Sequence, residues 1–200
     1  MSKSQSYLTQ VRREASGHEA RMRLRKSVAS KVKGKSTPQS LPNQNWDFVT
    51  ETNLKAMLVR DYSELGELLR VAAPKSTLAL CGSILEAVLV SILQRNETTA
   101  RKKHSELFPD KKFPDRQARP IDEWELYELI SVSTGLDILD DDSRRIAIAL
   151  KDYRNVIHPM VEIRRKTNLS DSYIVEAMIA LFKHILLVLS TIDREQFSLG

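Results

Sequence analysis

The sequence predicts an all-α protein, a bundle of four to five helices preceded by a basic N-terminal arm. Apolar residues recur at intervals of three and four through residues 46–195, the spacing of helices that bury one face. No segment alternates convincingly with the period of two that is typical of strands. Apolar residues are too sparse in residues 1–45 to form a core. We therefore expect a disordered arm and linker over residues 1–45 and a helical bundle over residues 46–195.

Positive charge is concentrated in the arm. Residues 1–36 hold ten Lys or Arg and two Glu, a balance of +8, whereas the whole chain carries +5. Such a segment can neutralise phosphates without reading base sequence, so we expect contact with RNA or another nucleic acid. A solvated tail, or a docking segment for an acidic partner, is the alternative. The expected contact residues are Arg12, Arg13, Arg21, Arg23, Arg25, Lys26, Lys31 and Lys33.

Of the first two predicted helices, the second is expected to lie at the centre of the bundle. One starts near Asp47, and Pro74 ends or bends the chain after it. The other covers roughly Ser76 to Gln94 and is apolar around most of its surface, which is typical of a helix surrounded by neighbours. Its Glu86 needs a partner if it is buried, and Arg154 is a candidate.

Two further features concern the same apolar helix. Gly82 and Ser83 are small enough to let a neighbouring helix approach closely. Cys81 is the only cysteine, so an intramolecular disulfide is excluded, and its apolar surroundings predict a buried, inert thiol.

The second half of the bundle is expected to begin after a long charged connection from Asn96 to Pro120. Asp122 and Glu125 have the spacing of a capping box, which predicts a short helix that Gly135 closes. Three aspartates, Asp140 to Asp142, are expected to cap the next helix rather than to bind a metal ion.

In that next helix the spacing of Ile146, Leu150, Tyr153 and Ile157 predicts a core stripe. The last helix is expected to begin near Ser170 or Asp171.

The first thirty-five residues lack the apolar segment of a secretory signal. The most apolar stretch, Thr77 to Leu93, is short for a membrane span. We therefore expect a cytoplasmic protein without a membrane partner.

One short constellation is a candidate for chemistry. Arg154 and His158 are four residues apart on the predicted helix, so they should lie one turn apart on one face. Pro159 should stop the helix at or before His158, which would leave the imidazole at a helix C-terminus. His158 could then move a proton of a ribose hydroxyl while Arg154 braces the phosphate and Asn155 holds a ligand oxygen. Alternatively, Arg154 and His158 only hold the helix end in place.

The order of two segments resembles the HEPN-like helical bundles of prokaryotes. These segments are Cys-Gly-Ser-Ile-Leu-Glu at residues 81–86 and Asp-Tyr-Arg-Asn-Val-Ile-His-Pro at residues 152–159. The resemblance covers roughly residues 47–192 and leaves the arm unexplained. It is closest to uncharacterised members whose late helix ends in Arg-Asn, two residues, His-Pro.

The resemblance implies a helical bundle that often forms homodimers. In active members the Arg and His form a metal-independent endoribonuclease site, often in toxin–antitoxin or phage-defence systems, and Arg154 and His158 match those positions. The nuclease motif usually has a longer gap than the three residues found here. Two hypotheses follow, an RNA-binding protein with this nuclease site and a non-catalytic interaction or scaffold module with another protein as its partner.

No cofactor or metal ion is expected from the sequence. None of the four histidines has a second His, Cys or carboxylate at a spacing typical of zinc. There is no Gly-rich phosphate loop. His184 lies beside the apolar stripe of the last helix, and we expect a structural histidine there.

Overall fold

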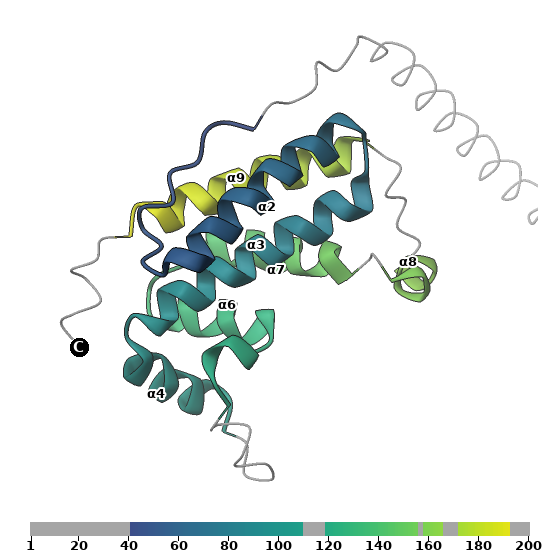
Figure 1. The fold of residues 1–200 in the computed structure, drawn as a ribbon. Helices are drawn as coiled ribbons and strands as arrows, with labels where there is room; N and C mark the ends of the chain where they lie inside the picture. The colour runs from purple at the N-terminus through teal and green to yellow at the C-terminus, as the bar shows by residue number, and fades with distance from the viewer. Residues whose placement is uncertain (1–40, 110–118, 156–157, 166–171, 193–200) are drawn as a thin grey trace, which may run out of the picture. The chain divides into compact units, whose positions relative to one another are not determined.

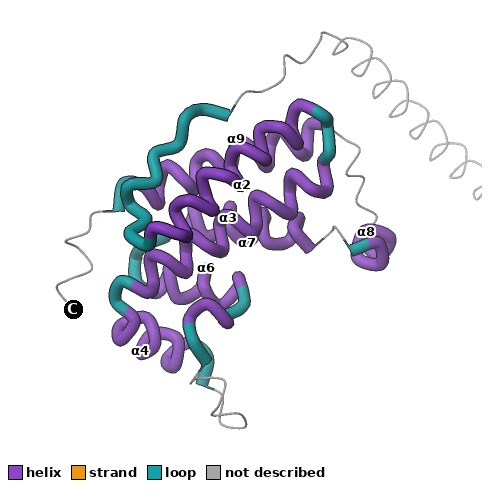
Figure 2. Tube along the Cα trace, viewed as in Figure 1, coloured by secondary structure: helices purple, strands orange, loops and turns teal. Residues whose placement is uncertain are grey.

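The computed structural model describes residues 41–109, 119–155, 158–165 and 172–192, all within a unit that spans residues 40–200. Helices joined by loops form this part of the chain, and it contains no strand (Figure 2). The predicted all-α class is therefore confirmed. In chain order the elements are α2 Thr52–Arg70, α3 Pro74–Gln94, α4 Glu97–Leu107, η1 Ile121–Glu123 (a single 3-10 turn), α6 Leu126–Gly135, α7 Asp141–Asn155, α8 Pro159–Arg165 and α9 Ser172–Ser190.

Helix α3 lies at the centre of the bundle (Figure 1). It contacts α2, α4, η1, α6, α7 and α9, so most of its apolar surface is covered, as its composition predicted. The helix begins at Pro74, although the sequence predicted that this proline would end or bend the chain. Proline suits a first helical turn, because the backbone N–H that it lacks would have no partner there.

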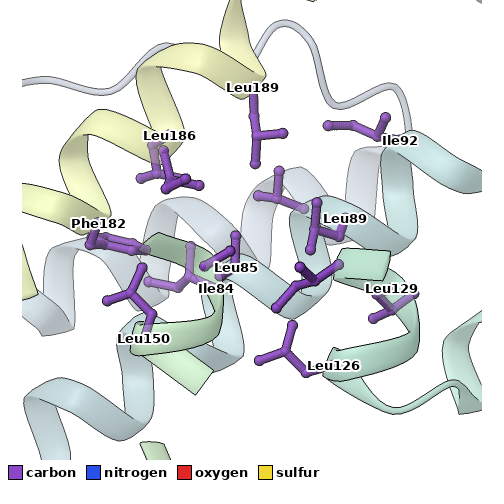
Figure 3. Packing of buried hydrophobic residues seen from close by; sticks show 14 of the residues in the cluster. Ile84, Leu85, Leu89, Ile92, Leu126, Leu129, Leu150, Phe182, Leu186 and Leu189 are labelled. Atoms are coloured by element: carbon purple, nitrogen blue, oxygen red, sulfur yellow. The ribbon is translucent and has the colours of Figure 1, made fainter. Parts of the chain in front are cut away.

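Part of the core is formed where α3 meets α6, α7 and α9 (Figure 3), and the same cluster continues onto α2 through Leu58, Tyr62 and Leu65. Each large side chain buried there contributes about 1.5–3 kcal/mol relative to exposure. The labelled side chains in this region are Ile84, Leu85, Leu89, Ile92, Leu126, Leu129, Leu150, Phe182, Leu186 and Leu189, all of them buried.

The chain enters the bundle through a turn, not through a helix that starts near Asp47. The carbonyl of Trp46 accepts a hydrogen bond from the backbone N–H of Val49, and its ring packs edge-on against Tyr62 of α2 at 5.7 Å between centroids. Helix α2 starts five residues after Asp47, where the carboxylate of Glu51 accepts backbone hydrogen bonds from the first turn.

Helix α4 occupies much of the segment that was predicted to be a charged connection from Asn96 to Pro120. The side chain of Asn96 caps its start by accepting from the N–H of Thr99 at 3.2 Å. Arg101 pairs with Glu97 one turn earlier at 2.7 Å. The prediction of a loop was wrong because α4 buries only two side chains, Ala100 and His104, and so has almost no apolar stripe.

The predicted capping box is displaced by three residues. Helix α6 begins at Leu126, and Glu128 returns to accept the backbone N–H of Glu125 at 2.7 Å. Gly135 is the last helical residue, but Asp137 has the left-handed backbone conformation beyond it, at φ 57°. The sequence located this helix correctly and misjudged how it is capped at both ends.

Two helices are long and apolar enough to cross a membrane, judged by length and composition only. In α3, 61% of the apolar window is buried, as in the core helix of many soluble proteins. In Tyr173–Ser190 of α9 the buried share is 33%. Helix α9 therefore combines the composition of a core helix with a largely uncovered side.

Candidate functional site

Helix α7 presents the first half of the candidate constellation. It starts where the Asp140 carboxylate accepts the backbone N–H of Ser143 at 2.7 Å, which confirms the predicted capping role of this aspartate. That hydrogen bond is the largest cause lowering the pKa of Asp140. Leu150 is buried farther along the helix. Arg154 is the second-to-last residue of α7, which ends at Asn155.

The side chain of Arg154 crosses α3 at Gly82 and ends at Glu86. A methyl group at Gly82 would lie 2.6 Å from Cδ and 2.9 Å from Cβ of Arg154, so only glycine leaves room for the arginine stem. One turn along α3, Oε2 of Glu86 lies 2.5 Å from Nη1 of Arg154. The predicted pairing of Glu86 with Arg154 and the predicted close approach at Gly82 are both confirmed.

This contact has the features of a structural joint between α3 and α7. The two charged side chains are 31% and 30% exposed, so solvent screens the pair, and a pair of this kind contributes about 0–1 kcal/mol. The arginine stem adds packing against the backbone of α3.

His158 is not one turn above Arg154 on a shared helix, and this part of the sequence prediction is wrong. Helix α7 ends at Asn155, and Pro159 is the first residue of α8. The backbone carbonyl of His158 accepts from the N–H groups of Val161 and Glu162, at 2.9 and 3.1 Å. The histidine thus precedes a new helix instead of ending the old one. Helix α7 does end before His158, as predicted from Pro159, but the same proline is also the first residue of α8.

The imidazole of His158 and the amide of Asn155 are both exposed. The backbone N–H of His158 donates to the carbonyl of Asn155 at 3.3 Å. Ile157, the last residue of the predicted core stripe, lies outside the described residues. Among the described residues, Arg154 forms an ion pair with Glu86, and it is the only one of the three predicted catalytic residues that does so.

Helix α8 is attached to the start of α3. Nζ of Lys75 lies 2.5 Å from Oε2 of Glu162, and Val161 packs partly buried against the core. Met160 and Ile163 are 70% and 69% exposed on another side of the helix. Helix α8 therefore contacts α3, the same helix whose Glu86 pairs with Arg154.

A buried polar cluster that the sequence did not predict lies between α4, η1 and α6. The ring of His104 stacks on Trp124 at 4.2 Å between centroids, and its Nε2 lies 3.2 Å from Oε1 of Glu128. The guanidinium of Arg119 donates to both oxygens of Glu128 at 3.0 and 3.1 Å. With His104 only 2% exposed, these contacts join the elements and leave the ring little access to a substrate.

The two remaining predictions about single residues had different outcomes. Cys81 is fully buried, as expected, and burial raises its pKa to about 12. His184 is exposed on α9, so the prediction of a structural histidine beside the core was wrong. The chain does have a structural histidine, but it is His104, in the segment that was predicted to be a connection.

Metal ligands do not cluster in the part of the chain that the structure describes: no three His, Cys, Asp or Glu side chains are placed to hold an ion together. The eight basic residues expected to contact nucleic acid, Arg12 to Lys33, lie outside the described residues.

No family model, curated protein or solved structure matches this chain. The candidate site is therefore interpreted from its own geometry. Arg154 is paired and partly covered, while Asn155 and His158 are exposed where α7 gives way to α8.

Proposed function

We propose that this chain is a HEPN-like helical interaction module in which Arg154 is a structural residue. The single observation that carries the proposal is the path of Arg154 across Gly82 to the carboxylate of Glu86. An arginine that braces a phosphate needs its bidentate edge free for the phosphate oxygens. Here a carboxylate from the neighbouring helix already neutralises that charge, and the stem is packed against α3.

The position of His158 supports the same proposal. A general base has to reach the proton of the substrate's ribose hydroxyl while the arginine binds the phosphate of the same substrate. His158 lies beyond the end of α7 at Asn155, so it does not share a helix with Arg154. In this proposal the bundle is a cytoplasmic scaffold whose surfaces bind another protein chain.

A metal-independent endoribonuclease in a defence or toxin–antitoxin setting is the second candidate function. The observation that favours it is exposure: the Arg154 side chain is 31% exposed, and the imidazole of His158 is open to solvent. The +8 charge of residues 1–36 would hold RNA near such a site through its phosphates. Binding of nucleic acid by the arm is compatible with either function.

The test is cleavage of a labelled pool of mixed RNA in EDTA by the wild-type chain and by His158→Ala and Arg154→Ala. We expect no cleavage above buffer by any of the three proteins. Filter binding of the same RNA to the same samples separates binding from cleavage. If the wild type cleaves RNA in EDTA and both substitutions abolish the cleavage, the proposal of an interaction module is wrong and the protein is a ribonuclease.

A further inference from the structure

Two large apolar side chains of α8 point into solvent. Met160 is 70% exposed and Ile163 is 69% exposed, the highest fractions of any large apolar side chain in the part of the chain that the structure describes. They are three residues apart, so they lie next to each other on the helix. Figure 1 shows α8 beside the bundle and not within it. Burial of such a side chain is worth about 1.5–3 kcal/mol, which a partner that covers both would supply.

The other side of α8 is attached to the bundle, and this attachment fixes which residues face outward. Glu162 pairs with Lys75 of α3, and Val161 packs partly buried against the core. A helix turns by about 100° per residue, so Met160, Ile163 and Arg164 share the opposite side. All three are exposed, and we refer to them as the α8 face.

The α8 face is apolar with a positive charge at one edge. Arg164 supplies that charge, whereas the one acid of α8, Glu162, lies on the attached side, where Lys75 neutralises it. Methionine and arginine are both enriched in the surfaces through which proteins bind each other. The α8 face therefore fits a partner that offers apolar side chains together with a carboxylate.

Charge and side-chain chemistry disfavour three other occupants. Residues 1–36 carry a balance of +8, so Arg164 repels the basic arm. The same face of a second copy would present the same positive charge. RNA has the complementary charge, but Met160 and Ile163 are aliphatic and give its bases no aromatic ring on which to stack.

An anionic membrane surface is the competing occupant, and the small apolar area of the face argues against it. A single myristoyl chain, with about fourteen carbons, gives only marginal binding to a bilayer. Met160 and Ile163 together offer about eight side-chain heavy atoms, so their insertion would stabilise less than that chain does. In a protein interface the same two side chains can enter a pocket while a carboxylate pairs with Arg164.

We propose that the α8 face binds an acidic peptide segment of another protein. Apolar side chains of that segment cover Met160 and Ile163, and one of its carboxylates pairs with Arg164. This inference rests on the proposed function and deepens it, because it names one surface of the interaction module and the chemistry of the partner that fits this surface.

The probes for the test are peptides selected from a phage-displayed random library on the immobilised full chain. We expect the selected peptides to combine Asp or Glu with large apolar residues. The peptide that binds most tightly is then synthesised and titrated by fluorescence polarisation. Its affinity should fall at least about tenfold in Ile163→Asp and also in Arg164→Glu. Added salt should weaken its binding to the wild type, because salt screens the contact between the carboxylate and the arginine.

Two substitutions on α2 are the matched controls. Val59→Asp changes another exposed apolar residue within a helix, and Arg70→Glu changes an exposed arginine at the end of a helix. Both should bind the peptide as the wild type does, and circular dichroism should show equal helix content in all variants. If no peptide is selected, or if the α8 and α2 variants bind it equally well, the proposal is wrong.

Sedimentation with phosphatidylglycerol vesicles tests the competing occupant. The basic arm can attract such vesicles by itself, so the informative quantity is the difference between the wild type and Ile163→Asp. We expect the two to bind equally. A loss in Ile163→Asp that Val59→Asp does not share would assign the α8 face to lipid and overturn the proposal. Either result leaves the joint between Arg154 and Glu86 and the RNA cleavage assay unchanged, so failure at α8 is distinguishable from failure of the proposed function.

Discussion

Arg154 near the end of α7 and Glu86 in the middle of α3 form an ion pair at 2.5 Å, with the arginine stem lying across Gly82. A glycine, a partly exposed acid and a partly exposed base thus join the two helices at one place. The same arginine belongs to the constellation that resembles a nuclease motif. Its position in this joint is the reason for proposing a structural role.

Replacing Gly82 by alanine should destabilise the protein. The new methyl group would meet Cδ and Cβ of Arg154 at 2.6 and 2.9 Å, and because Cβ is fixed to the backbone, α7 has to shift. We expect a loss of about 1–3 kcal/mol in urea unfolding. Gly66→Ala in α2 is the control, since nothing lies within 4 Å of its new methyl group. It should gain about 0.5–1 kcal/mol through the helix preference of alanine. Equal effects of the two substitutions would show that Gly82 is not packed against Arg154.

Replacing His104 by alanine should also be costly. It removes the ring stacked on Trp124 and leaves Glu128 with two of its three partners, Arg119 and the backbone N–H of Glu125. We expect a loss on the order of 2–4 kcal/mol in the free energy of unfolding. His158→Ala, at an exposed site, should change it by less than about 0.5 kcal/mol. If the two histidine variants unfold at the same urea concentration, the buried cluster does not stabilise the fold.

The Asp140 cap should give α7 a charge-dependent stability. The hydrogen bond from Ser143 lowers the pKa of Asp140 below its ordinary value of 3.8. A carboxyl whose pKa is lower in the folded state stabilises the protein above its unfolded pKa, and the effect is lost as pH falls through the folded value. Asp140→Asn keeps an oxygen acceptor but has no charge. Its thermal midpoint should therefore be lower than that of the wild type near neutral pH, and the difference should shrink below pH 3.8. A difference that does not change with pH would contradict a charge effect.

The Cys81 thiol should resist alkylation in the native protein. It is fully buried, and burial raises its pKa to about 12, so little thiolate forms at neutral pH. Because the chain has one cysteine, labelling by iodoacetamide followed by mass spectrometry reports this site alone. We expect labelling only after urea unfolds the protein. Complete and rapid labelling in native buffer would show that the α3 core opens.

The features that the sequence predicted well are those that depend on the apolar pattern. The nearly all-apolar segment around Leu85 had to become the central helix, because no other arrangement covers such a surface. Its Glu86 required a partner for the same reason, and Arg154 was the candidate that the late helix offered. Gly82 could be recognised as a close-approach site because it interrupts a run of larger side chains.

The features that were predicted poorly from the sequence have weak or ambiguous local signals. Helix α4 is held by His104 and capping contacts, which leave no stripe in the sequence, although Asn96 and the Glu97–Arg101 spacing were available as signs of a helix. Pro159 is compatible with either end of a helix, so the position of His158 could not be derived from it.

The most direct test of the structural role of Arg154 is a double-mutant cycle with Arg154→Met and Glu86→Gln, read by urea unfolding. Met keeps most of the stem without the charge, and Gln keeps the shape of Glu86. We expect each single variant to be less stable than the wild type and the pair to show a coupling of about 0.2–1 kcal/mol. A variant Arg154→Met as stable as the wild type, with no coupling to Glu86, would contradict the structural role and return Arg154 to the candidates for catalysis.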